Sequence, residues 1–151
     1  MIRGIIFDFN RTLYIPEIKK IPEETIELLK NLKKLGFSLA LISIKEAERE
    51  EIIEAYNLFT LFSILKFVDE KNRAVFQEVL MSLKCSSEEV VVIGDRVRSE
   101  IKIANGMGIK TIWYRQGKFS NELPQEKVEL PNWTIDYLPQ IKDILCGGST
   151  Q

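Results

Sequence analysis

The stretch that decides the fold is GIIFDF, residues 4–9, an apolar run that carries a single carboxylate at Asp8. The run shows no alternation of polar and apolar side chains, which is typical of a strand buried on both faces, as in a parallel sheet. The VVVI run at residues 90–93 has the same character and is followed by Gly94 and Asp95. Both runs therefore predict inner strands, each with a carboxylate at its end.

Strand-like and helix-like segments alternate through the rest of the chain. The segment PEETIELLKNLKKLG, residues 22–36, opens with proline and acidic residues and closes with lysines and a glycine, which indicates a helix. The alternation predicts an α/β fold, a three-layer, doubly wound, Rossmann-like parallel sheet with helices on both faces. We expect strands at 4–9, 37–43, 62–67, 90–93, 110–114 and 133–137, helices at 22–36, 46–56, 73–83, 98–107 and 139–145, and a long surface loop at 115–132.

The composition is that of one globular domain. The chain has 151 residues, of which 45% are hydrophobic and 28% charged, and this length suffices for a full core. The formal net charge of −1 argues against general nucleic-acid or membrane-surface binding. No apolar run reaches the roughly 20 residues of a membrane span, and no signal-peptide cleavage pattern follows the N-terminus. We expect a cytoplasmic domain over residues 1–145 and a frayed tail over 146–151.

The chain contains no histidine and two isolated cysteines, Cys85 and Cys146. The lack of histidine excludes Ser-His-Asp and Cys-His catalysis and imidazole metal ligands. The cysteines form no CxxC pair, so we expect them to be reduced and structural. Any chemistry must therefore use carboxylates, lysine, hydroxyls, thiols or backbone groups, and any metal would be a hard, oxygen-bound ion such as Mg²⁺.

Polar residues stand where the predicted strands end. In an open parallel sheet the ligand binds beyond the carboxyl ends of the strands, where Asp8, Ser43 and Asp95 are expected. Taken singly, an ion-paired aspartate or a turn-starting serine explains each of them. Two carboxylates at neighbouring strand ends repel each other, however, so we expect a cation between them. Mg²⁺ meets that need, and Lys71 could add a second positive charge.

Four short motifs, taken in order, resemble those of the haloacid dehalogenase (HAD) superfamily. They are Asp8-x-Asn10-x-Thr12, the strand end at Ser43, Lys71, and Gly94-Asp95-x-x-x-x-Glu100. The resemblance extends from residue 5 to about residue 145 and implies a small, phosphatase-like HAD domain.

The resemblance also implies roles for these residues. Asp8 would attack a phosphoryl group and form an aspartyl-phosphate. The Mg²⁺ ligands would be the carboxylates of Asp8 and Asp95 and the main-chain carbonyl of Asn10. Ser43 and Lys71 would hold the phosphoryl group during its transfer.

Two positions depart from the family pattern. The general acid and base is usually a second aspartate, and here Asn10 stands in its place without a titratable proton. The second acid of the fourth motif is usually aspartate and here is Glu100, whose side chain is one methylene longer. Thr12 matches the family pattern and would help shape the loop after the nucleophile. Losing general acid–base catalysis typically costs about 10²–10⁴-fold in rate. We therefore expect a slow, Mg²⁺-dependent phosphoric-monoester hydrolase or phosphotransferase; the alternative is a non-catalytic relative that binds Mg²⁺ or a phosphorylated partner.

No stretch of the sequence is long enough for a cap domain. The connection from Leu13 to the first helix is short, and residues 44–70 have room only for a helix and a strand. An open site excludes water poorly. We therefore expect a phosphorylated substrate that is bulky or macromolecular, or a small one covered by a lid from a second subunit, which leaves a homo-oligomer open.

Overall fold

The structure, a computed structural model, describes residues 1–147 and contains one sheet of six parallel strands in the order β3-β2-β1-β4-β5-β6. From β1 the chain moves outward to β2 and β3 and then returns to place β4 on the other side of β1. This reversal between β1 and β4 is the switch point, where doubly wound sheets open at their carboxyl ends. The strands are β1 (Gly4–Asp8), β2 (Ser38–Ile44), β3 (Ile64–Val68), β4 (Val90–Gly94), β5 (Lys110–Tyr114) and β6 (Trp133–Ile135).

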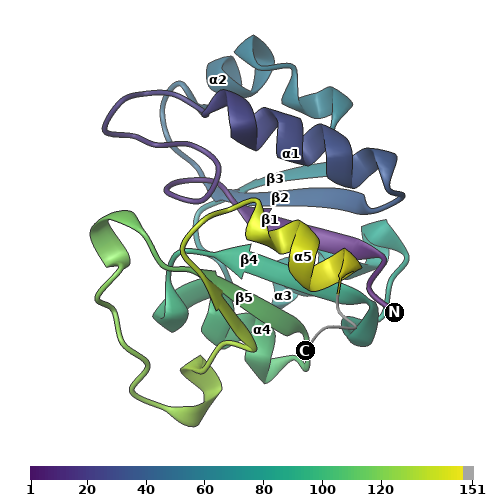
Figure 1. Ribbon diagram of the computed structural model, residues 1–151, viewed down its shortest axis with the longest axis vertical. Helices are drawn as coiled ribbons and strands as arrows, with labels where there is room; N and C mark the ends of the chain where they lie inside the picture. Colours follow the sequence, from purple (N-terminus) through teal and green to yellow (C-terminus); the bar gives the residue numbers. More distant parts are fainter. Residues whose placement is uncertain (148–151) are drawn as a thin grey trace.

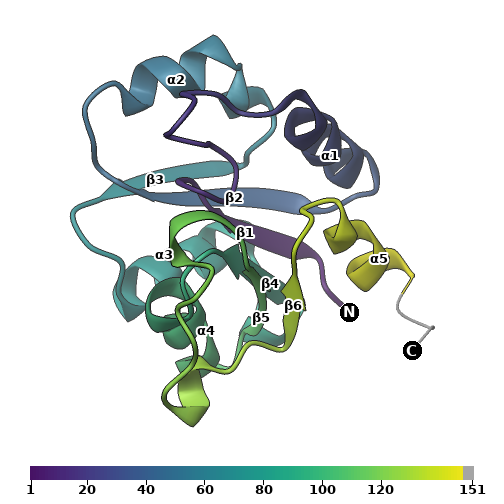
Figure 2. The ribbon, with the colours of Figure 1, turned by 60° about the vertical axis from the view of Figure 1, so that its left-hand side comes forward.

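Helices cover both faces of the sheet, as Figures 1 and 2 show. On one face lie α1 (Glu23–Lys34), α2 (Arg49–Ala55) and α5 (Gln140–Cys146), and on the other lie α3 (Arg73–Leu83) and α4 (Lys102–Gly106). Successive side chains of β1 alternate between the two cores: Ile5 and Phe7 pack into the first and Ile6 into the second, as the period of a strand requires. The predicted three-layer parallel fold is confirmed.

The first helix shows how the sequence builds a layer. Pro22 precedes α1, whose first turn holds acidic residues and whose last turn holds lysines, and both charges suit the helix dipole. Leu28, Leu29 and Leu32 are buried on one side of it, where each contributes about 1.5–3 kcal/mol of hydrophobic stabilisation.

Several expected boundaries shift, for local reasons. The helix expected from residue 46 begins at Arg49, because Glu48 takes a left-handed conformation with φ 66°. The helix expected over 98–107 is divided into a π-type turn, Val97–Ile101, and α4, because Ser99 leaves helical geometry (φ −123°, ψ −106°). The expected strands at 62–67 and 133–137 lie at Ile64–Val68 and Trp133–Ile135. The loop at 115–132 contains two short 3₁₀ turns, Gly117–Phe119 and Lys127–Glu129.

No separate cap domain interrupts the sheet within residues 1–147. Residues 9–22 form a loop closed by an antiparallel bridge between Ile15 and Lys20. None of the helices in this part of the chain is long and apolar enough to cross a membrane. Of the expected tail, Cys146 ends α5, and residues 148–151 lie outside the described residues.

Candidate active site

A tight loop holds Asp8 at the carboxyl end of β1. The N–H of Tyr14 donates to the carbonyl of Phe9 at 3.0 Å, and the two rings stack with centroids 5.1 Å apart. Within this loop the Thr12 hydroxyl donates to Asp8 Oδ2 at 3.3 Å. The loop thereby turns the chain away from β1 while the Asp8 side chain faces the cleft at the strand ends.

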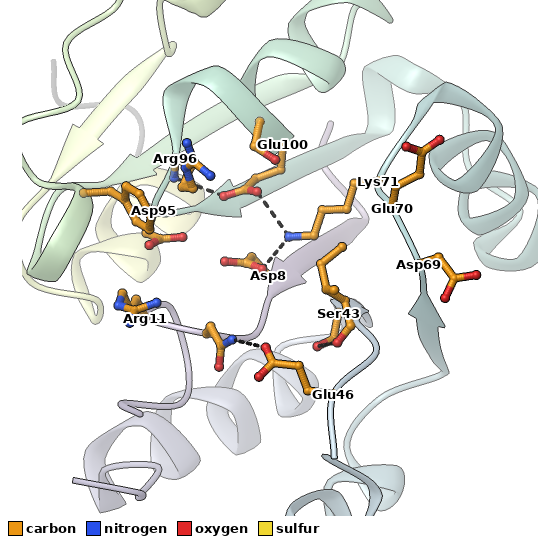
Figure 3. A pocket seen from close by; sticks show the side chains of 14 residues that line it. Asp8, Arg11, Ser43, Glu46, Asp69, Glu70, Lys71, Asp95, Arg96 and Glu100 are labelled. Carbon is orange, nitrogen blue, oxygen red and sulfur yellow. Dashed lines mark hydrogen bonds and ion pairs between the residues drawn. The ribbon is translucent and has the colours of Figure 1, made fainter. Parts of the chain in front are cut away.

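Three buried carboxyl groups, those of Asp8, Asp95 and Glu100, meet at the switch point. One oxygen from each lies within 4.8 Å of the others. Lys71 enters this cluster from the segment before α3: its Nζ is 2.5 Å from Asp8 Oδ1 and 3.2 Å from Glu100 Oε1 (Figure 3). A lysine just before a helix is usually a solvated surface charge, but the Lys71 side chain is only 8% exposed. One ammonium group therefore faces three carboxyl groups.

The π-type turn brings Glu100 back beneath the end of β4. Its Oε2 accepts the Arg96 N–H at 3.1 Å. A Cβ at Gly94 would overlap the Glu100 side chain, so only glycine leaves room for this carboxylate. On the same strand end, the Trp113 indole N–H donates to the Asp95 carbonyl at 2.9 Å. π-type turns occur frequently at functional sites, and this one allows the longer acid to reach the cluster.

Burial and mutual repulsion shape the charge state of the cluster. Burial raises the pKa of Asp95 to about 9, and repulsion by Asp8 and Glu100 adds to the effect. Burial also raises the pKa of Glu100, although attraction to Lys71 opposes the rise. For Lys71, burial acts to lower the pKa, but attraction to Asp8 and Glu100 outweighs burial and raises it. Lys71 is thus an ammonium ion, and Asp95 keeps its proton near neutral pH unless another cation enters.

The donor set of this cluster fits a hard divalent cation. Mg²⁺ prefers carboxylate and carbonyl oxygens and commonly uses one or two carboxylates together with substrate phosphate. The described part of the chain offers no histidine there, which removes the ligands that favour zinc or copper. The fit rests on the clustered oxygens of Asp8, Asp95 and Glu100, which share the single ammonium group of Lys71.

The cluster lies in a cleft of about 430 Å³. Ser43, at the end of β2, also lines this cleft, but its hydroxyl donates to the neighbouring Ile44 carbonyl at 3.2 Å and makes no hydrogen bond to Asp8 or Lys71 among the described residues. Asn10 lines the cleft too, and its side-chain amide donates to Glu46 Oε1 at 2.9 Å. The structure therefore brings all the expected positions together and directs the Asn10 amide towards Glu46.

The cleft also has lining residues that the sequence did not single out, among them Arg11, Glu46, Arg96 and Phe119. The guanidinium carbon of Arg96 lies 4.1 Å from the centre of the Phe119 ring. Both arginines are also held by ion pairs with glutamates elsewhere in the chain. These residues stand in loops without periodic patterning, so only the path of each loop brings them to the cleft.

Comparisons with known proteins agree with this geometry. Residues 70–141 match the HAD-hydrolase-like family. A glyceraldehyde 3-phosphate phosphatase of Pyrococcus furiosus is 31% identical over 134 residues, which are 85% of this chain and 55% of that protein. The chain thus spans about half the length of this curated relative.

Solved structures share the fold. An uncharacterised protein from Listeria monocytogenes serotype 4b has a TM-score of 0.79 and 19% identity, covering 99% of this chain and 100% of that one. A D,D-heptose 1,7-bisphosphate phosphatase from B. bronchiseptica, complexed with magnesium and phosphate, has a TM-score of 0.78 and 12% identity, covering 97% and 99%. The protein is an α/β protein with a carboxylate cluster at the switch point of its sheet. It belongs to the haloacid dehalogenase superfamily.

Proposed function

We propose that this protein is a Mg²⁺-dependent phosphoric-monoester hydrolase that works through an aspartyl-phosphate on Asp8. The observation that carries the proposal is the placement of Asp8: its carboxylate faces the cleft at the switch point, beside Lys71 and the clustered carboxyl groups. The names of the related phosphatases support the same class of reaction.

The proposed reaction begins with attack of an Asp8 carboxylate oxygen on the substrate phosphorus, while the bond from phosphorus to the leaving oxygen breaks. Lys71 and the Ser43 hydroxyl would hold phosphoryl oxygens in line for this transfer. Water then cleaves the aspartyl-phosphate and regenerates Asp8. The carboxylates of Asp8 and Asp95 and the carbonyl of Asn10 would hold Mg²⁺, which when bound supplies positive charge for the phosphoryl oxygens.

We propose a small phosphorylated organic molecule as the substrate. The relatives named glyceraldehyde 3-phosphate phosphatase favour this class. Nothing in residues 1–147 or in the comparisons supports the macromolecular substrate or the borrowed lid expected from the missing cap. A panel of sugar phosphates, aryl phosphates, acyl phosphates and phosphopeptides would identify the class; exclusive turnover of phosphopeptides would contradict the proposal.

The central test is hydrolysis of an aryl phosphate with Mg²⁺ and with EDTA, together with mass spectrometry of acid-quenched protein. We expect Mg²⁺-dependent turnover and a phosphoryl group on Asp8. Asp8→Asn should abolish both, whereas Asp143→Asn, an exposed change on α5, should alter neither. Unchanged turnover in Asp8→Asn would refute the mechanism.

The second candidate is a non-catalytic relative, and the observation that favours it is the amide of Asn10, which cannot transfer a proton. Isothermal titration with Mg²⁺ should show binding by the wild type and weaker binding by Asp95→Ala in either case. Turnover distinguishes the hydrolase from the non-catalytic relative. Mg²⁺ binding without hydrolysis of any panel member and without labelling of Asp8 would establish that the protein is non-catalytic.

A further inference from the structure

Glu46 contacts Asn10, the residue that replaces the usual aspartate of the first motif. It follows β2, lines the same cleft as Asp8 and accepts the Asn10 side-chain N–H at 2.9 Å. Arg49 NH2 lies 2.7 Å from the same oxygen, Glu46 Oε1. A titratable carboxylate therefore stands within hydrogen-bond distance of the amide that replaces the usual acid.

The residue that supports Glu46 is buried. Arg49 is 4% exposed, and its guanidinium carbon lies 4.6 Å from the centre of the Phe9 ring. Phe9 in turn stacks on Tyr14 within the loop that positions Asp8. The arginine that pairs with Glu46 is thus packed against the loop that carries the nucleophile.

One oxygen of Glu46 remains available for chemistry. Both contacts fall on Oε1, and Oε2 accepts no hydrogen bond from residues 1–147. The Glu46 side chain is 51% exposed, so water reaches it. The other acidic residues of the rim, Asp69 and Glu70, are exposed, and Figure 3 shows them on the far side of Lys71 and Ser43 from Asp8.

The geometry points to Glu46 as the general base for the second half of the reaction, the hydrolysis of the aspartyl-phosphate. This inference rests on the proposed function. Glu46 Oε2 takes a proton from water, the water oxygen bonds to phosphorus, and the bond between phosphorus and the Asp8 oxygen breaks. Inorganic phosphate leaves, Asp8 is again a carboxylate, and the proton on Glu46 passes to solvent.

The assignment to the second half follows from the charge of the pair. Glu46 Oε1 lies 2.7 Å from the Arg49 guanidinium, and a cation beside a carboxyl group favours the form that accepts a proton from water. In the first half, a weakly basic leaving group departs without protonation, so that step does not need Glu46. Asn10 cannot act as a general base. Glu46, from another segment of the chain, takes that role in the hydrolysis of the aspartyl-phosphate.

Rapid-quench hydrolysis of an aryl phosphate with saturating Mg²⁺ tests this division of labour. In Glu46→Gln we expect the first release of aryl alcohol at the wild-type rate, followed by a steady-state rate lowered about 10²–10⁴-fold. Phosphoryl-Asp8, measured by mass spectrometry after acid quench, should accumulate towards one per protein. Glu51→Gln, an exposed change of the same charge on α2, should behave as the wild type.

Two outcomes would overturn the role of Glu46. One is an unchanged steady-state rate in Glu46→Gln; the other is an equal fall of the first release and the steady state, which a purely structural contact with Asn10 would produce. Absence of label on Asp8 in every variant would instead refute the aspartyl-phosphate mechanism itself, so the two failures are distinguishable.

Discussion

Lys71 Nζ lies 2.5 Å from Asp8 Oδ1, and the two side chains are only 8% and 9% exposed. This ion pair joins the end of β1 to the segment before α3. Because Lys71 also contacts Glu100, it is the counter-charge of a cluster that otherwise consists of carboxyl groups. The same contact places an ammonium group where a transferring phosphoryl group would meet Asp8.

Replacing Lys71 should destabilise the metal-free protein. Lys71→Met leaves buried carboxylates without their partner, and removing one member of a buried pair costs about 3–5 kcal/mol. Urea unfolding in EDTA would measure the loss. Lys110→Met, at an exposed position in β5, is the control, and an equal loss in the two variants would show that the ion pair carries no stability.

The stability of the metal-free protein should fall as pH rises. The pKa of Asp95 is raised from 3.8 to about 9 in the folded state, chiefly by burial. Between these values the folded state binds more protons than the unfolded state, so the free energy of unfolding decreases with increasing pH. Urea unfolding in EDTA from pH 5 to pH 9 should show this decline in the wild type and a smaller one in Asp95→Asn. Parallel profiles would exclude Asp95 as the source.

Asn10→Asp should raise turnover, with a gain of at most about 10²–10⁴-fold. The new carboxylate can protonate the leaving oxygen and later deprotonate water. It would also face Glu46 Oε1, now 2.9 Å from the Asn10 amide, and like charges at that distance repel. The double variant Asn10→Asp/Glu46→Gln exchanges donor and acceptor and should relieve the repulsion.

The steady-state rate of aryl phosphate hydrolysis would be compared among four proteins: the wild type, Asn10→Asp, Glu46→Gln and the double variant. We expect the double variant to be faster than Glu46→Gln alone, because the introduced acid supplies the base. If both proteins with Asn10→Asp are no faster than their parents, the position does not exchange protons with the substrate or water.

Gly94→Ala should disrupt the carboxylate cluster. The added methyl group would overlap Glu100, and overpacking of this kind costs about 1–3 kcal/mol. Displacing Glu100 should also weaken Mg²⁺ binding, measured by titration calorimetry. Gly106→Ala is a matched control, because the nearest atom to its Cβ would be 3.9 Å away, on Arg73. Equal Mg²⁺ affinity in the two variants would argue against a role for Glu100 near the metal.

Turnover should favour good leaving groups. With an amide at Asn10, alkoxides depart unprotonated, whereas aryl and acyl phosphates leave as weakly basic anions. A comparison of kcat/KM for aryl phosphates and sugar phosphates measures this preference. Faster turnover of sugar phosphates would show that another group protonates the leaving oxygen.

Local patterns in the sequence were enough to predict the sheet and its switch point. The GIIFDF and VVVIGD runs are buried on both faces, as their lack of alternation indicated. Their carboxylates, Asp8 and Asp95, then had to meet, because neighbouring parallel strands end at the same edge of a sheet. Boundaries were less certain where a single residue leaves regular geometry, as Glu48 and Ser99 do.

Only the tertiary structure decided which side chains line the cleft and which contacts they make. Whether Lys71 is a surface charge or a buried partner depends on contacts with β1 and with the turn after β4, which no local period reveals. The contact between Asn10 and Glu46 joins residues 36 positions apart, and Phe119 reaches Arg96 only through the course of a long loop. Strands and helices follow from the period of hydrophobic residues along the chain, whereas a site follows from side chains that different loops bring together in space.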